Sequence, residues 1–252
     1  MRLLLVNDDG INAEGIQTLA KELEKEYELT IVAPDDQRSA SGHSITLRKP
    51  IVVKRVKIEG IKSETYTISG TPADCVRVAL DKIVKDPLDL VVSGINVGVN
   101  LGADVLYSGT VSAAIEANMY KIPSIATSAQ VKDNHGNFQA AAKYTSRIIR
   151  NIGDRLIEHN LVLNINTPNI EDEKIKGIKV CRIGGVIYDY YVEEKDENEE
   201  KFVIQTEGRD EKKSSIGNDT DRYYVKEGYV TVTPITYDLT NFGLLGEVES
   251  WF

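Results

Sequence analysis

The chain has 252 residues, 41% of them hydrophobic and 27% charged, which is the balance of a soluble globular protein long enough for one large domain. Its formal net charge of −9 excludes a protein that grips the phosphate backbone of a nucleic-acid polymer over a broad surface. The two cysteines have no metal-site spacing, and the sequence shows no leader and no membrane-spanning run, so we expect a cytoplasmic protein without a membrane partner.

Strands and helices alternate through the first two thirds of the chain. In chain order, we predict a strand at 2–6, a helix at 13–27, a strand at 28–34, a helix at 71–84, a strand at 88–94, a helix at 109–121, a strand at 122–129, a helix at 138–152 and a strand at 161–168. Continuously apolar strands between amphipathic helices predict an α/β fold. We expect a Rossmann-like three-layer sandwich with a mostly parallel sheet.

Two segments depart from this alternation. Residues 46–70 read as a β insertion in an α/β catalytic core that we place at 1–170. Residues 171–252 read as a β-rich extension or oligomerisation arm, with no helix expected after Pro168. The charged run at 193–201 is typical of a solvated turn.

Polar sequence follows the strands where their carboxyl ends should meet, which is where ligands bind in such folds. Asp8 and Asp9 come directly after the first strand. Adjacent carboxylates repel each other unless a cation or a shared proton offsets the charge. They therefore indicate a site for a hard divalent ion such as Mg²⁺ or Mn²⁺. A helix cap or an Asx-turn with Gly10 remains the structural alternative.

Three other loops supply suitable partners for a metal or a phosphate group. The loop after the second strand offers Ser39 and His43, although such composition is also typical of an exposed polar loop. The segment "SGINVGVNLG" places Asn96 and Asn100 among glycines, which also occur in plain turns.

A predicted helix begins at "YSGTVSAA", which contains Ser108, Gly109 and Thr110. The free N–H groups of a helix N-terminus suit a bound phosphate, and a capping role for the hydroxyls is compatible with this. The segment lacks the lysine of a nucleotide-binding P-loop, and it lacks the glycine pattern of a dinucleotide site.

Taken together, six segments resemble the SurE (survival protein E) family of metal-dependent nucleoside monophosphate phosphatases. They are "LLLVNDDGI", "IVAPDDQRSASGHSIT", "SGTPADCV", "DLVVSGINVGVNLG", "YSGTVSAAIEA" and "TDRYYVKEGYVTVTPIT". The resemblance runs from residue 1 to about residue 240.

The resemblance implies one divalent metal ion, Mg²⁺ or Mn²⁺, at a fixed set of residues. The implied ligands are Asp8, Asp9, Ser39 and Asn96, of which Asp8, Asp9 and Asn96 are the catalytic candidates. The implied phosphate and substrate contacts are Asn100, Ser108, Gly109, Thr110 and His43. Where family members often carry an acidic residue or a histidine near "TD", this chain has Asp219 and Asp221 but no histidine, which favours a structural role for that segment.

The expected reaction is hydrolysis of nucleoside 5′- and 3′-monophosphates to nucleoside and phosphate, and activity on short polyphosphate stays open. One alternative is a phosphatase that forms a covalent aspartyl-phosphate at Asp8, although such enzymes have an Asp-x-Asp spacing. Another is a non-enzymatic receiver-like signalling module, which is typically about half this length.

The resemblance also implies a homodimer or homotetramer with exchanged C-terminal segments. The chain ends in "NFGLLGEVESWF", whose apolar side chains are expected to dock on a surface. Docking on the chain's own core is the alternative.

Overall fold

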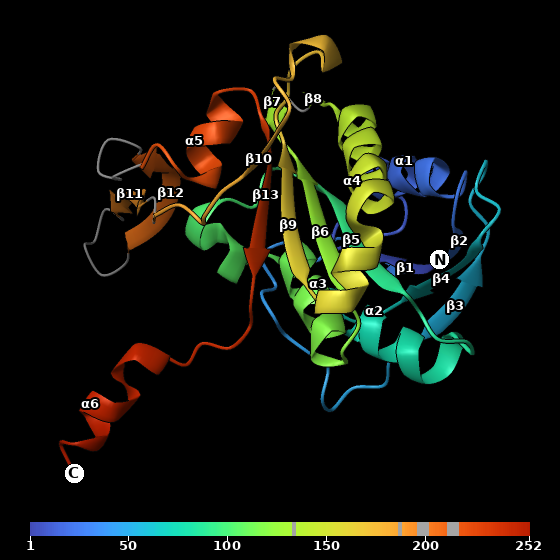
Figure 1. Ribbon diagram of the computed structural model, residues 1–252, viewed down its shortest axis with the longest axis horizontal. Coiled ribbons are helices and arrows are strands. Elements are labelled where there is room, and N and C mark those ends of the chain that lie inside the picture. Colours follow the sequence, from blue (N-terminus) through green and yellow to red (C-terminus); the bar gives the residue numbers. More distant parts are fainter. Residues whose placement is uncertain (133–134, 186–187, 196–201, 211–216) are drawn as a thin grey trace.

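The computed structural model describes residues 1–132, 135–185, 188–195, 202–210 and 217–252 (Figure 1). The strands are β1 (Arg2–Val6), β2 (Glu28–Pro34), β3 (Val53–Val56), β4 (Glu64–Ile68), β5 (Leu90–Val97), β6 (Ser124–Ala129), β7 (Val131–Lys132), β8 (His135–Gly136), β9 (Val162–Thr167), β10 (Ile178–Val180), β11 (Tyr188–Lys195), β12 (Phe202–Asp210) and β13 (Val230–Ile235). The helices are α1 (Glu14–Leu23), α2 (Pro72–Val78), α3 (Gly109–Met119), α4 (Phe138–His159), α5 (Asp221–Lys226) and α6 (Leu245–Glu249). Among these residues, no helix is both long and apolar enough to cross a membrane.

The described strands form a nine-stranded sheet in the order β10-β13-β9-β6-β5-β1-β2-β4-β3. Neighbours are parallel except for the pairs β9–β13 and β3–β4. The side chains of β1 alternate between two apolar layers. Leu3 and Leu5 pack with α1 and α4 on one face, whereas Leu4 and Val6 pack with α2 and α3 on the other. Figure 1 shows these helices covering the two faces, so the predicted three-layer α/β fold with a mostly parallel sheet is confirmed.

The helix starts follow from capping chemistry in the sequence. Thr71 caps α2 and exchanges hydrogen bonds with Asp74 in a capping box, and Pro72 occupies the first turn. Ser108 caps α3, and its side chain accepts a hydrogen bond from the Val111 N–H. These caps fix where each helix begins beside the carboxyl edge of the sheet.

The second half differs from expectation in two elements. The expectation that no helix follows Pro168 is wrong, because Asp221–Lys226 forms α5 and Leu245–Glu249 forms α6. Tyrosine and valine favour strands in general, but Thr220 caps α5 and starts a helix there. Asp221, in the first turn of α5, also accepts hydrogen bonds from the N–H groups of Gly102 and Gly184, which hold this turn in place.

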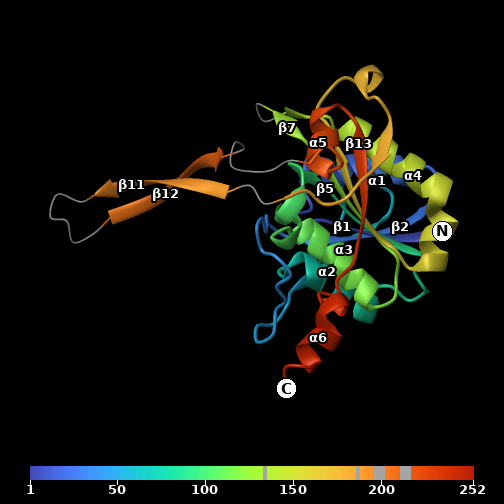
Figure 2. The ribbon, with the colours of Figure 1, turned by 60° about the vertical axis from the view of Figure 1, so that its left-hand side comes forward.

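The expected β-rich region divides between two sheets. Strands β10 and β13 hydrogen-bond into the main sheet, whereas β11 and β12 form a separate two-stranded sheet that projects from the body (Figure 2). The segment at 196–201, which includes most of the predicted charged turn, lies outside the described residues. The division of the chain at residue 170 into a core and an arm stays a prediction.

Candidate active site

The carboxyl ends of β1, β2 and β5 lie side by side at one edge of the sheet, because β1 pairs with both other strands in parallel. Asp8 and Asp9 follow β1, the loop 35–46 follows β2, and Asn96 lies near the end of β5. The N-terminus of α3 reaches the same place. This is the position at which open α/β sheets bind ligands.

Asp8 is buried, with 3% of its surface exposed, and both of its carboxylate oxygens accept hydrogen bonds from Thr110. The Thr110 hydroxyl donates to Oδ1 at 2.5 Å, and the Thr110 N–H donates to Oδ2 at 3.2 Å. Burial raises the pKa of Asp8 to about 6; the Thr110 hydroxyl lowers it, and the neighbouring Asp9 raises it. A cation at this carboxylate would offset both the burial and the repulsion.

Asp9 is half-buried and turns toward β5. Its Oδ2 accepts a hydrogen bond from the Val97 N–H at 2.9 Å, and its Oδ1 accepts one from Gln37 at 3.4 Å. Burial raises the pKa of Asp9 as well, against the hydrogen bond from the Val97 N–H. The same Gln37 amide donates to Ser39 Oγ at 2.9 Å, so Ser39 lies one side chain away from Asp9.

Gly109 allows the first turn of α3 to approach Asp8 closely. A Cβ on Gly109 would lie 2.9 Å from both Cβ and Oδ2 of Asp8, and 3.0 Å from Ser41 Oγ. A side chain here would push the helix away from the carboxylate. Ser108 caps the same turn, and because its Oγ accepts the Val111 N–H, its own proton remains available to a ligand.

The two asparagines have different surroundings. Asn96 is half-buried and donates its side-chain amide to the Gly98 carbonyl at 2.7 Å, which leaves Oδ1 as the acceptor end of that side chain. Asn100 is buried and donates its amide to Ser128 Oγ at 2.9 Å. Its backbone carbonyl accepts hydrogen bonds from the side chains of Asn164 and Asn166 on β9. These contacts hold the segment 93–102, here called the glycine-asparagine loop, against the sheet.

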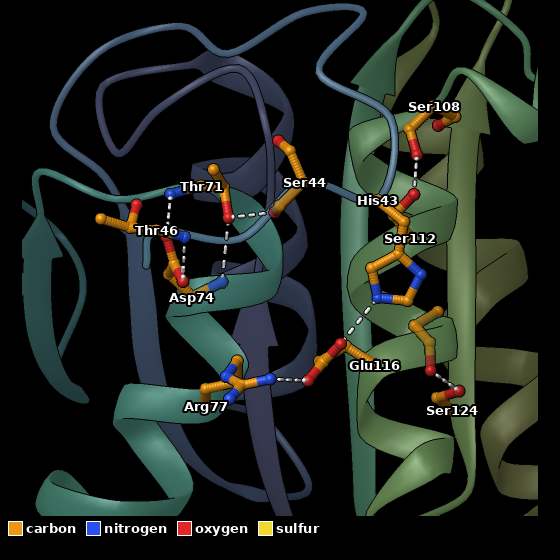
Figure 3. A network of polar contacts seen from close by, with 11 residues as sticks. His43, Ser44, Thr46, Thr71, Asp74, Arg77, Ser108, Ser112, Glu116 and Ser124 are labelled. Atoms are coloured by element: carbon orange, nitrogen blue, oxygen red, sulfur yellow. Dashed lines mark hydrogen bonds and ion pairs between the residues drawn. The ribbon is translucent and has the colours of Figure 1, made fainter. Parts of the chain in front are cut away.

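His43 contacts the flank of α3, where its Nε2 lies 2.6 Å from Oε2 of Glu116 (Figure 3). Arg77 of α2 donates to the other oxygen of Glu116 at 3.2 Å. Glu116 is buried, with 3% exposed. Glu116 is a functional candidate that the sequence motifs do not include, although a single charge inside a helix of small residues is a signal for such a buried carboxylate.

Asp221, which lies in the segment near "TD" with an expected structural role, is a further buried carboxylate. It is fully buried and accepts hydrogen bonds from the N–H groups of Gly102 and Gly184, each at 2.9 Å. The neighbouring Arg222 donates to the Leu101 carbonyl at 3.0 Å. Helix α5 therefore clamps the end of the glycine-asparagine loop, in keeping with the structural role expected for this segment.

Within the described residues, no group of three or more His, Cys, Asp or Glu side chains could hold a metal ion. The site instead combines an acidic pair with neutral oxygens. Mg²⁺ and Mn²⁺ accept such donors, because they take one or two carboxylates and fill the remaining positions with water, neutral oxygens and substrate phosphate. The donor set at Asp8 and Asp9 thus fits a hard divalent ion.

Comparison with known proteins identifies the family of this chain. The family model described as "Survival protein SurE" matches residues 3–189. A protein of Clostridium botulinum (strain ATCC 19397 / Type A) named 5′-nucleotidase SurE is 52% identical over 100% of this chain and 99% of its own. A protein of the same name from Clostridium tetani is 49% identical over the whole of both chains. The crystal structure of the SurE protein from Aquifex aeolicus superposes with a TM-score of 0.87 at 37% identity, covering 100% of this chain and 99% of that one. The chain belongs to the SurE family.

Proposed function

We propose that the protein is a phosphoric monoester hydrolase of the 5′-nucleotidase type. It hydrolyses nucleoside 5′-monophosphates, and also 3′-monophosphates, to nucleoside and phosphate. Relatives named 5′-nucleotidase SurE support the reaction class. The observation that carries the proposal is the pairing of Asp8 with Thr110, since it joins an acidic strand end to the first turn of a helix. Such a turn suits a phosphoryl group.

Asp8, Asp9, Ser39 and Asn96 would hold one divalent metal ion, Mg²⁺ or Mn²⁺. When bound, the ion would neutralise charge on the substrate phosphoryl group and lower the pKa of an attacking water. The raised pKa values of the two aspartates support this, because a nearby positive charge favours their ionised forms. One of the two is the candidate general base.

The helix N-terminus would bind the phosphoryl oxygens. The Ser108 hydroxyl has a proton to donate, and the backbone N–H of Gly109 belongs to the first turn of α3, beside the Thr110 N–H that Asp8 accepts. These donors are fixed before the substrate arrives, so they stabilise the charge that develops during transfer without reorganising. Asn100 and His43 are proposed to line the rest of the substrate pocket.

A homodimer or homotetramer that exchanges C-terminal segments is proposed as the assembly. Residues 236–252 are exposed throughout, and this segment extends away from the body (Figures 1 and 2). Its exposed apolar side chains include Leu239, Phe242, Leu245, Trp251 and Phe252. Exposed apolar residues in such number support docking on a partner.

Phosphate release from a panel of nucleoside monophosphates tests the proposal, with Mg²⁺, Mn²⁺ or EDTA present. The panel compares the wild type with Asp9→Asn and with Asp219→Asn, which changes an exposed aspartate paired with Arg182. We expect metal-dependent release that only Asp9→Asn abolishes. Release that survives EDTA and Asp9→Asn would remove the metal site. Phosphate trapped covalently on Asp8 would favour the aspartyl-phosphate alternative, and no release at all would favour the signalling module.

A further inference from the structure

The loop after β2 contains two residues in the left-handed region of backbone conformation. Ala40 and Gly42 both have φ +53. Glycine adopts this conformation freely, whereas an alanine is disfavoured there because its Cβ crowds the following carbonyl. Ala40 therefore keeps this conformation only while its surroundings hold the loop on either side.

Two backbone hydrogen bonds hold the loop close to Ala40. The Arg38 N–H donates to the Asp8 carbonyl at 2.7 Å, and the Gly42 N–H donates to the Tyr107 carbonyl at 3.1 Å. The acceptors lie at the end of β1 and just before α3. The loop thus bridges the two sides of the proposed phosphate site.

His43 adds a side-chain anchor to the same loop (Figure 3). Its Nε2 lies 2.6 Å from the buried carboxylate of Glu116, and Arg77 binds the second oxygen of that carboxylate at 3.2 Å. A buried carboxylate stays charged only when partners of this kind compensate it. Glu116 has no part in the proposed chemistry, so its burial calls for another explanation.

Ser41 lies between these anchors, one residue after the strained Ala40. Its hydroxyl oxygen is buried and has no hydrogen-bond partner among the residues that the structure describes. It lies 3.0 Å from the point that a Cβ on Gly109 would occupy, and Oδ2 of Asp8 lies 2.9 Å from the same point. A buried hydroxyl without a partner is costly, and an oxygen of a bound phosphoryl group would supply the acceptor that is needed.

We propose that Ser41 is a further phosphate-binding residue and that Glu116 is its positioning residue. Glu116 acts through His43 to keep the loop 38–44 in the conformation that sets the Ser41 hydroxyl beside the first turn of α3. This inference rests on the proposed function, because the ligand of Ser41 is the substrate phosphoryl group. It adds the Ser41 hydroxyl, on the loop after β2, to the hydrogen-bond donors proposed at the N-terminus of α3.

The first experiment measures inhibition of monophosphate hydrolysis by inorganic phosphate in Ser41→Ala. We expect the inhibition constant and KM to rise about tenfold, the loss of one hydrogen bond to a charged group. Tm should stay level or rise, because the hydroxyl has no partner to lose in the free protein. Ser44→Ala is the matched control, since Ser44 is exposed and uses its backbone carbonyl to contact Thr71. An inhibition constant in Ser41→Ala equal to that of the control overturns the assignment of Ser41.

The second experiment asks whether Glu116 acts through Ser41. Glu116→Gln keeps the size of the side chain but replaces the charge-assisted contact with His43 by a weaker neutral one. We expect the inhibition constant to rise about fivefold, with a smaller change in kcat. In Ser41→Ala/Glu116→Gln the increase should be no larger than in Ser41→Ala alone, because both changes remove the same contact. A lower Tm with an unchanged inhibition constant, or additive increases, would leave Glu116 with a purely structural role.

A third variant tests the link through loop conformation. Ala40→Gly in the Glu116→Gln background removes the penalty for the left-handed conformation, so the loop needs less support. We expect part of the phosphate affinity to return. An inhibition constant that does not recover would contradict the positioning role.

These outcomes separate this inference from the proposed function. A wild type that releases phosphate from no monophosphate would defeat the proposed function, and this inference with it. An active wild type whose Ser41→Ala variant matches the Ser44→Ala control would overturn the inference alone.

Discussion

Thr110 donates its hydroxyl to Oδ1 of Asp8 at 2.5 Å and its backbone N–H to Oδ2 at 3.2 Å. The two residues are 102 positions apart in the chain. Asp8 lies two residues after the end of β1, and Thr110 lies in the first turn of α3, whose small side chains pack against the sheet. This contact links the charge of Asp8 to the position of the turn proposed to bind phosphate, and substitution of either residue tests it.

Thr110→Val keeps the shape of the side chain but removes the hydroxyl. Since that hydroxyl lowers the pKa of Asp8, the pKa should rise above about 6 in the variant. The acid limb of the pH profile of kcat/KM should therefore move to higher pH. Thr110→Ser keeps a hydroxyl and should keep the wild-type profile. An acid limb that stays in place in Thr110→Val would show that Asp8 does not control it.

Asp8→Asn should stabilise the metal-free protein at neutral pH. The pKa of Asp8 in the folded protein, about 6, lies above its ordinary value of 3.8, so the folded state binds the proton more tightly than the unfolded state. Ionisation of Asp8 therefore destabilises the fold progressively as pH rises from about 4 to 6, and the full effect remains above that range. In EDTA at pH 7 the gain in free energy of unfolding should reach up to about 3 kcal/mol, and it should vanish below about pH 4.

Asp219→Asn should change the free energy of unfolding in the opposite direction. The hydrogen bond from Arg182 lowers the pKa of this exposed aspartate. Its ionised form is therefore favoured by folding, and the variant should lose a little stability at pH 7 rather than gain it. Denaturant unfolding at pH 4, 5, 6 and 7 compares the two variants. A stability gain in Asp8→Asn that does not depend on pH would contradict the burial of a charged Asp8 as its cause.

Gly109→Ala should reduce activity while leaving the fold intact. The new Cβ would lie 2.9 Å from Oδ2 of Asp8 and 3.0 Å from Ser41 Oγ, so α3 or the carboxylate must shift. A misplacement of about 1 Å costs about a hundredfold in rate where groups are positioned for reaction, so we expect a loss of this order. Gly153→Ala in α4 is the control, because its Cβ would meet the flexible end of Met1. Equal kcat/KM values for Gly109→Ala and the wild type would mean that this close approach does not matter.

The fold could be predicted from the sequence because its signals are local. Apolar runs and helical spacing marked the strands and helices of the core, and Ser108 and Thr71 marked two helix starts. Helix α5 was not predicted, because Tyr223 and Tyr224 favour strands and the deciding contacts of Asp221 come from distant segments.

The candidate site could be predicted only where local sequence signals mark its residues. Asp8, Asp9 and Thr110 follow strand ends or begin a helix, so chain position alone suggested that they meet. The pairing of His43 with Glu116 joins residues 73 positions apart on a loop and a helix flank. No local pattern specifies such a contact, since it depends on how α2 and α3 pack.

Asp221→Ala should destabilise the protein strongly. The carboxylate is fully buried, and its removal leaves the N–H groups of Gly102 and Gly184 without their acceptor. Unpaired buried groups cost about 1–3 kcal/mol each, so we expect a loss of roughly 3 kcal/mol or more in free energy of unfolding. Phosphate affinity should fall as well, because Gly102 begins the segment that leads to Ser108. Asp219→Ala, at an exposed position, should lower the free energy of unfolding far less. Equal losses in the two variants would contradict a stabilising role for the contacts of Asp221 with Gly102 and Gly184.

Deletion of residues 239–252 should reduce the size of the assembly. The deleted segment carries exposed apolar side chains that include Leu239, Phe242, Trp251 and Phe252, and none of them is buried against the body of its own chain. If a partner chain covers them, burial of this surface contributes to association, and its loss should shift the molar mass measured by light scattering toward the monomer. The core sheet contains no residue of this segment, so Tm of the truncated monomer at low concentration should change little. Trp251→Ser/Phe252→Ser keeps the chain length and should show the same shift in smaller measure. A full-length protein that is monomeric at all concentrations would rule out segment exchange.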